Sequence, residues 1–252
     1  MNDASAGVRA LGLAMALATA GVSLACYFGA LPSSHFPLYL SSPSLATRED
    51  METNLVWQTA FTLGRCTVAF AFAALAYIGL AAIFSWRMPA SVRAAAAVAQ
   101  SIPPLVFAPL LLLAFGANEP TLLLAAAAFT FFGLLISTPD RDVTRTTRAA
   151  FSRLARQSSA YRWWRLYLPE TLSSMRDAFS MLWLVLVGVV VVLEYMGGTQ
   201  GFGRAMSVLV SYAEISSVAW ASVGLAACAG IVSSALRGAA QASSSAAENL
   251  GG

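Results

Sequence analysis

The stretch that decides the fold is residues 55–85, LVWQTAFTLGRCTVAFAFAALAYIGLAAIFS, which contains a single charged residue, Arg65. An α-helix needs about 20 mostly apolar residues to cross the hydrocarbon core of a bilayer. This run is longer than that, so the sequence predicts a membrane-spanning helix that is tilted or that begins outside the bilayer.

Similar apolar runs recur along the chain. Of its 252 residues, 58% are hydrophobic and only 11% are charged, whereas soluble domains have about 25% charged residues. The runs are continuous and do not alternate, which disfavours a β-barrel. We therefore expect an all-α integral membrane protein with about six transmembrane helices, at residues 8–31, 55–85, 91–115, 119–138, 172–196 and 214–237. The first run could instead be a signal peptide, but its length and single Arg9 favour an uncleaved span.

Prolines and glycines interrupt two of these regions. Pro103, Pro104 and Pro109 fall inside the third run, and each lacks a backbone donor, so we expect kinks there. Broken helices occur at membrane depth only where neighbouring helices or a cavity satisfy the freed groups. Pro104 and Pro109 are therefore candidate pathway residues. The glycine-rich segment 197–203, GGTQGFG, predicts a tight reversal outside the membrane.

The arginines predict the orientation. All 15 basic residues are arginine, and the net charge is +3. If the amino terminus is inside, only Arg48 and Arg204 lie in outward loops, and most of the others lie in inward loops. The positive-inside rule then places 139–170 and both termini in the cytoplasm. Because the charge follows topology, no nucleic-acid partner is predicted. The three cysteines lie within apolar runs without metal-ligand spacing, and His35 has no ligand partner nearby, so no metal site is expected.

Residues 145–156, RTTRAAFSRLAR, form an amphipathic helix in a helical projection, too short and too polar to span. Its two opposite arcs consist of Arg145, Arg148, Arg153 and Arg156 on one side, and Ala150, Phe151, Leu154 and Ala155 on the other. Two interpretations are open. The helix could rest on lipid headgroups with interfacial tryptophans, or it could dock a protein through the aromatic anchors Tyr161, Trp163 and Trp164.

Four short motifs occur in order along residues 55–237. They are Thr62, Leu63 and Arg65; Pro104, Pro109, Leu110, Phe115, Gly116 and Glu119; Leu166, Leu168 and Pro169; and Glu194, Gly201 and Gly203. Together they resemble the permease subunits of binding-protein-dependent ABC importers, in particular the nitrate, bicarbonate, sulfonate and taurine group. The usual Glu-Ala-Ala of that family is replaced by Ala150, Phe151 and Ser152, and its usual Gly by Arg156.

The resemblance implies a type I importer permease fold with a cytoplasmic coupling helix. Residues 1–54 would form an amino-terminal span and periplasmic loop, 55–237 a five-helix core containing the coupling loop 139–170, and 238–252 a flexible cytoplasmic tail. The coupling loop would contact a separate ATPase through Arg145, Arg148, Phe151, Arg153, Leu154, Arg156, Ser158, Tyr161, Trp163, Trp164, Leu168 and Pro169. The pathway or gate would include Arg65, Pro104, Pro109, Glu194, Gly201 and Gly203.

The resemblance also implies the partners. ATP and Mg would be bound by ABC ATPase subunits and not by this chain, which would have no catalytic residue. A second permease subunit would complete the pathway, and a periplasmic or lipid-anchored binding protein would deliver a small oxyanion or an organic sulfonate. The location would be the bacterial inner membrane, in contact with lipid.

An integral membrane enzyme or a non-transport scaffold is the alternative. An enzyme would need an acid, base or nucleophile cluster at one membrane face. The inward loops offer Asp140 and Asp142 beside the arginines, whereas His35 lies on the other side. These residues do not form a catalytic set.

Overall fold

The computed structural model describes residues 14, 17–25, 27–28, 55–84, 89–137, 161, 168–211, 218–220 and 222–234, and this part of the chain is helical without strands. Its principal helices are α2 (Leu55–Ile83), α3 (Ala90–Ser101), α4 (Pro104–Phe115), α5 (Glu119–Ser137), α8 (Leu168–Gly197) and α9 (Phe202–Ser211). A further apolar helix covers Val218–Ser234. Residues 17–25 are also helical and are called the amino-terminal helix below. The expected all-α class is confirmed for this part of the chain.

Two described helices, α2 and α5, are each long and apolar enough to cross a membrane. Two bent pairs would raise the number to four: Ala90–Ser101 with Val106–Phe115, and Met181–Gly197 with Phe202–Ser211. Two to four candidate spans suggest a multi-pass membrane protein. The expected spans at 55–85 and 119–138 therefore coincide with helices of sufficient length.

The prolines of the third apolar run break it where expected. α3 ends at Ser101, Pro103 precedes α4, and Pro104 is the first residue of α4. Proline fits this position because the first amides of a helix have no intrahelical acceptor. The two helical segments are bent by 96°. Pro109 behaves differently, since α4 continues through it. The expected kink is thus confirmed at Pro103 and Pro104.

The glycine-rich segment does not make the simple reversal that its composition predicts. α8 ends at Gly197, a new helix begins at Phe202, and the axes on either side are bent by 52°. The Gly198 N–H donates to the Glu194 carbonyl at 2.9 Å, which closes the last turn of α8. The glycines therefore connect two helices that pack against each other.

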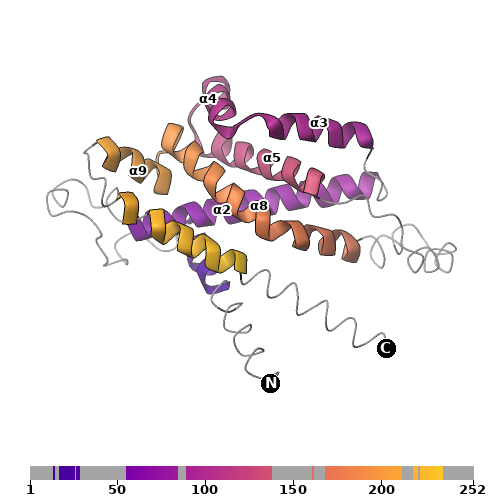
Figure 1. Cartoon of the computed structure of the whole chain (residues 1–252), viewed down its shortest axis with the longest axis horizontal. Helices are drawn as coiled ribbons and strands as arrows, with labels where there is room; N and C mark the ends of the chain where they lie inside the picture. Colours follow the sequence, from indigo (N-terminus) through magenta and orange to yellow (C-terminus); the bar gives the residue numbers. More distant parts are fainter. Residues whose placement is uncertain are drawn as a thin grey trace, which may run out of the picture.

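The core lies where α2, α5 and α8 meet. α2 packs against both other helices, and α5 also packs against α8. Figure 1 shows α5 between α3 and α2, with α8 crossing the bundle. Small side chains occupy the tightest positions, including the fully buried Cys66, Ala69 and Ala126. Helix association in a membrane depends on such close packing, because lipid tails supply no hydrophobic driving force between helices.

Gly64 brings the amino-terminal helix against α2. A Cβ at this position would overlap the Ser23 carbonyl oxygen and lie 2.7 Å from the Tyr27 Cβ. We expect Gly64→Ala to lower the unfolding free energy by about 1–3 kcal/mol, the usual effect of overpacking. Thermal unfolding in detergent measures this. Gly79→Ala is the matched control on the same helix, since a Cβ there meets nothing within 4 Å. Equal stability of the two variants would contradict this contact.

Candidate functional site: a buried charge network

The network begins on one face of α2. Gln58, Thr62 and Arg65 are separated by four and then three positions, so they lie on the same side of the helix. All three are buried, with exposed fractions of 4%, 0% and 1%. Arg65 is the eleventh residue of α2, about 15 Å along the helix axis from its start. A charged side chain at such a depth needs a partner.

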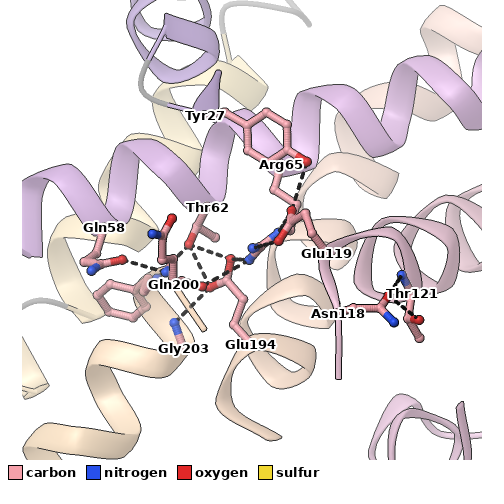
Figure 2. Close-up of polar contacts among 12 residues, drawn as sticks. Tyr27, Gln58, Thr62, Arg65, Asn118, Glu119, Thr121, Glu194, Gln200 and Gly203 are labelled. Atoms are coloured by element: carbon pink, nitrogen blue, oxygen red, sulfur yellow. Dashed lines mark hydrogen bonds and ion pairs between the residues drawn. The ribbon is translucent and has the colours of Figure 1, made fainter. Parts of the chain in front are cut away.

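Arg65 joins two carboxylates from distant parts of the chain. Its Nε donates to Glu119 Oε1 at 2.7 Å and its Nη2 to Glu119 Oε2 at 2.5 Å, a two-pronged contact. Its Nη1 donates to Glu194 Oε1. Figure 2 shows the guanidinium between the two acids. The Arg65 Cζ also lies 5.0 Å from the centre of the Phe61 ring, within cation–π range. Arg65 thus connects α2 with α5 and α8.

Glu119 is positioned by the start of α5. Asn118 caps this helix, because its Oδ1 accepts the Thr121 N–H at 2.9 Å and the Thr121 hydroxyl at 2.7 Å. Glu119 is then the first helical residue, where a negative charge is favoured by the helix dipole. The Tyr27 hydroxyl donates to Glu119 Oε1 at 2.9 Å. The Glu119 side chain is 35% exposed, so the network has one partly open edge.

Glu194 is the fully buried acid of the network. The Thr62 hydroxyl lies 2.7 Å and 2.9 Å from its two carboxylate oxygens. The Gly203 N–H donates to Oε2 at 2.9 Å. With the Arg65 contact, both carboxylate oxygens are occupied by donors, which a buried carboxylate requires.

The amino end of α9 is capped by side chains from α2 and α8. The Gly201 N–H donates to Gln58 Oε1 at 2.5 Å, and the Phe202 N–H donates to Thr62 Oγ1 at 2.7 Å. The Gly203 N–H donates to Glu194, as described above. The first amides of a helix lack intrahelical acceptors. Here three consecutive amides find acceptors on neighbouring helices, so these side chains fix the orientation of α9.

The charges of the network are compensated by two helix termini. As ionised groups, Arg65 neutralises one of the two carboxylates and leaves one negative charge. A helix amino terminus carries about half a positive charge. Glu119 begins α5 and Glu194 accepts an amide of α9, so the two termini together offset the remaining charge. Glu119 is partly exposed, so Glu194 is the only acid of this network that is fully buried, and it lies beside Arg65 and the start of α9.

Two glycines allow the backbone to approach Glu194. Gly201 has φ +110°, a conformation that other L-residues rarely adopt. A Cβ at Gly201 would overlap the Glu194 carboxylate, and one at Gly203 would overlap the Val191 carbonyl oxygen. The motif of Glu194, Gly201 and Gly203 therefore has a steric explanation. The backbone of 201–203 can lie against the Glu194 carboxylate only if positions 201 and 203 have no side chain.

The structure brings four of the six predicted pathway or gate residues together: Arg65, Glu194, Gly201 and Gly203. Pro104 and Pro109 lie on α4. The proposed role of these six residues in a pathway stays a prediction.

The predicted coupling residues mostly lie outside the described residues, namely Arg145, Arg148, Phe151, Arg153, Leu154, Arg156, Ser158, Trp163 and Trp164. Tyr161 is helical and 42% exposed. Leu168 is the first residue of α8, so Pro169 lies in the first helical turn, as expected.

Sequence reasoning missed two members of the network and undervalued two others. Tyr27 and Gln58 were not expected to act, and Thr62 and Glu119 were noted only as motif positions. Gln58 could have been found, because it lies one and two helical turns before Thr62 and Arg65. Tyr27 could not, since it is on another helix. No group of three His, Cys, Asp or Glu side chains in the described part of the chain could hold a metal ion.

Comparison with known protein families, with curated proteins and with solved structures finds no match to this chain.

Proposed function

We propose that this chain is the transmembrane subunit of an ATP-driven importer, working as a dimer and coupled to a separate ATPase through residues 145–169. Its fold would be that of a type I ABC importer permease with about six spans in a bacterial inner membrane. The substrate class would be a small oxyanion or an organic sulfonate, delivered from outside by a binding protein.

The observation that carries this proposal is the convergence of motif residues. Three of the four motifs that resemble importer permeases supply side chains or amides to one buried network: Thr62 with Arg65, Glu119, and Glu194 with Gly203. Charge pairing alone would bring Arg65 to an acid, but it does not account for Thr62 and the Gly203 amide, which also contact Glu194. The meeting of these motif residues supports the interpretation that they belong to one functional unit.

The network fits a gate better than a substrate ligand. The Arg65 guanidinium already contacts two carboxylates, so little of its hydrogen-bonding capacity remains for an anionic substrate. In the proposed orientation, α2 and α5 begin at the outer face and α8 ends there. Arg65, Glu119 and Glu194 would then hold the outer ends of three helices together. When the helices rock during alternating access, this contact would either have to break or the three helices would have to move together.

The coupling loop gives the direct test. We expect an affinity-tagged chain, co-expressed with the products of its neighbouring genes, to retain an ATPase during purification. Replacing residues 145–165 by a glycine–serine linker of equal length should lower the recovered ATPase by roughly tenfold or more, because interface energy concentrates in a few aromatic and arginine anchors. Trp163→Ala and Arg153→Ala should weaken recovery in the same direction.

Deletion of residues 241–252 is the control, since the tail is not part of the proposed docking element. Size-exclusion profiles in detergent establish that each variant is folded. Unchanged ATPase recovery and unchanged substrate uptake after replacement of 145–165 would overturn the docking proposal. Recovery of a catalytic activity by the chain alone would favour the membrane-enzyme alternative instead.

A further inference from the structure

A groove of about 410 Å³ lies between the amino-terminal helix, the first part of α2 and the Val218–Ser234 helix. In Figure 1 the indigo amino-terminal helix and the yellow helix lie beside α2. The groove is within the size range of small-molecule sites. Residues from all three helices line it, among them Ala18, Val22, Leu55, Ala60, Trp220 and Gly224.

The lining is apolar and well packed on its inner side. No charged side chain lines the groove. Leu55, Leu63 and Leu225 form part of its wall and are only 3%, 3% and 7% exposed. The Thr59 hydroxyl donates to the Leu55 carbonyl at 2.7 Å within its own helix, so it offers no free polar group to a ligand. Thr19 and Ser23 also line the groove, but most of its surface is apolar, and a mainly apolar occupant complements such a lining.

Small residues create the space. Ala18, Ala60 and Gly224 come from the three different helices. A Cβ at Gly224 would meet nothing within 4 Å, so this glycine does not serve close helix packing. The three helices are therefore separated along the groove by an opening that the described side chains leave free.

The position of the groove indicates where its occupant comes from. It lies beside Leu55–Leu63, the first nine residues of the apolar helix α2, and therefore near one end of that helix. Trp220 lines it and is 74% exposed. Tryptophan is enriched at the level of lipid headgroups, where one part of the ring is apolar and the other contacts water. A molecule entering here would come from the bilayer.

We propose that this groove binds one acyl chain of a membrane phospholipid. The concave shape between three helices fits a single flexible hydrocarbon chain, whereas a second copy of the protein would need a broad complementary face. The uncharged lining contacts the chain and not the headgroup. Binding therefore depends on acyl-chain length and not on headgroup charge. The bound chain links the amino-terminal helix to the Val218–Ser234 helix across α2.

Photo-crosslinking in vesicles tests this proposal. The purified protein is reconstituted with a phosphatidylethanolamine that carries a diazirine at the end of one acyl chain, and labelled peptides are identified by mass spectrometry. We expect labelling of residues 55–63 and 218–228. Gly224→Leu should lower that labelling by roughly tenfold, the effect of losing the burial of about two methylene groups.

Gly230→Leu is the matched control. Gly230 lies on the same helix, a Cβ there also meets nothing within 4 Å, and it does not line the groove. Labelling in this variant should equal that of the unaltered protein. Replacing the labelled lipid by a phosphatidylglycerol with the same acyl chain should also leave the labelling unchanged.

Three outcomes would overturn the proposal. Equal labelling in Gly224→Leu and Gly230→Leu would show that the groove does not hold the chain. Labelling could instead be as strong at Leu113, which is 85% exposed, as in the groove. That result would mean that the labelled lipid contacts all exposed surfaces and does not bind in the groove. Labelling of exposed sites such as Leu113 with none at residues 55–63 and 218–228 would show that no lipid chain enters the groove.

Cys228 gives a second measurement that needs no groove-filling variant. It lines the groove and is partly exposed, whereas Cys66 is fully buried. In a Cys26→Ser protein stripped of lipid by detergent, adding long-chain phosphatidylcholine should slow maleimide modification of Cys228 several-fold. A short-chain phosphatidylcholine should not. Equal rates with both lipids would count against a bound acyl chain.

Discussion

Arg65→Met is expected to lower the unfolding free energy by about 3–5 kcal/mol, because it leaves Glu119 and Glu194 without their shared cation. Single hydrogen bonds inside membrane proteins contribute only about 0.6 kcal/mol on average. The expected loss is larger because Glu194 is fully buried and would lose the cation that contacts its carboxylate. Thermal or denaturant unfolding in detergent micelles measures the effect.

Three further variants define the origin of the loss. Arg204→Met, which removes an exposed arginine from α9, should leave stability within about 0.5 kcal/mol of the unaltered protein. Arg65→Lys should be intermediate, because a lysine ammonium cannot reproduce the fork that contacts both carboxylates. Adding Glu119→Gln and Glu194→Gln to Arg65→Met should recover much of the lost stability. If Arg65→Met is as stable as Arg204→Met, the network contributes no such stabilisation.

Gly201→Ala is expected to be, together with Gly203→Ala, one of the two most damaging glycine substitutions in the described part of the helical bundle. It combines a backbone cost of about 1–2 kcal/mol at positive φ with a Cβ that overlaps the Glu194 carboxylate. The carboxylate cannot move aside without losing Arg65, Thr62 and the Gly203 amide. We expect a total loss of roughly 2–5 kcal/mol, measured by the same unfolding experiment.

Gly188→Ala provides the matched comparison within α8. A Cβ at Gly188 meets nothing within 4 Å, so the gain in helix propensity should make this variant neutral or more stable by up to about 1 kcal/mol. Gly203→Ala should resemble Gly201→Ala, since its Cβ would overlap a backbone carbonyl that cannot rotate away. Similar stability of Gly188→Ala and Gly201→Ala would contradict the close approach to Glu194.

The helices of this protein follow from its composition, because a long apolar run has few ways to satisfy its backbone in a membrane other than an α-helix. The runs at 55–85 and 119–138 correspond closely to Leu55–Ile83 and Glu119–Ser137. The break at Pro103 and Pro104 was predictable for the same local reason, since proline lacks the amide that a continuing helix needs.

The network was only partly predictable. Arg65 and Glu194 stand out because charges are rare in apolar helices. Gln58 and Tyr27 do not stand out, since an amide or a phenol in an apolar run has many ordinary explanations. The start of α9 at Phe202 was also missed. Glycines 201 and 203 suggest a turn when read alone, and they permit a helix start only because Gln58, Thr62 and Glu194 accept its first amides.

The separation of Arg65 from its partners has a consequence for biosynthesis. Glu119 follows it by 54 positions and Glu194 by 129. At about 5–20 residues per second, Glu119 is made roughly 3–11 s after Arg65 and Glu194 roughly 6–26 s after it. During this interval Arg65 lies in an apolar helix without its two acids, and insertion scales assign about 2.5 kcal/mol or more to an arginine at the centre of a helix. Arg65→Met should therefore insert more readily at the translocon while folding to a less stable protein. The same charge thus hinders insertion of α2 into the membrane and later stabilises the packing of α2 against α5 and α8.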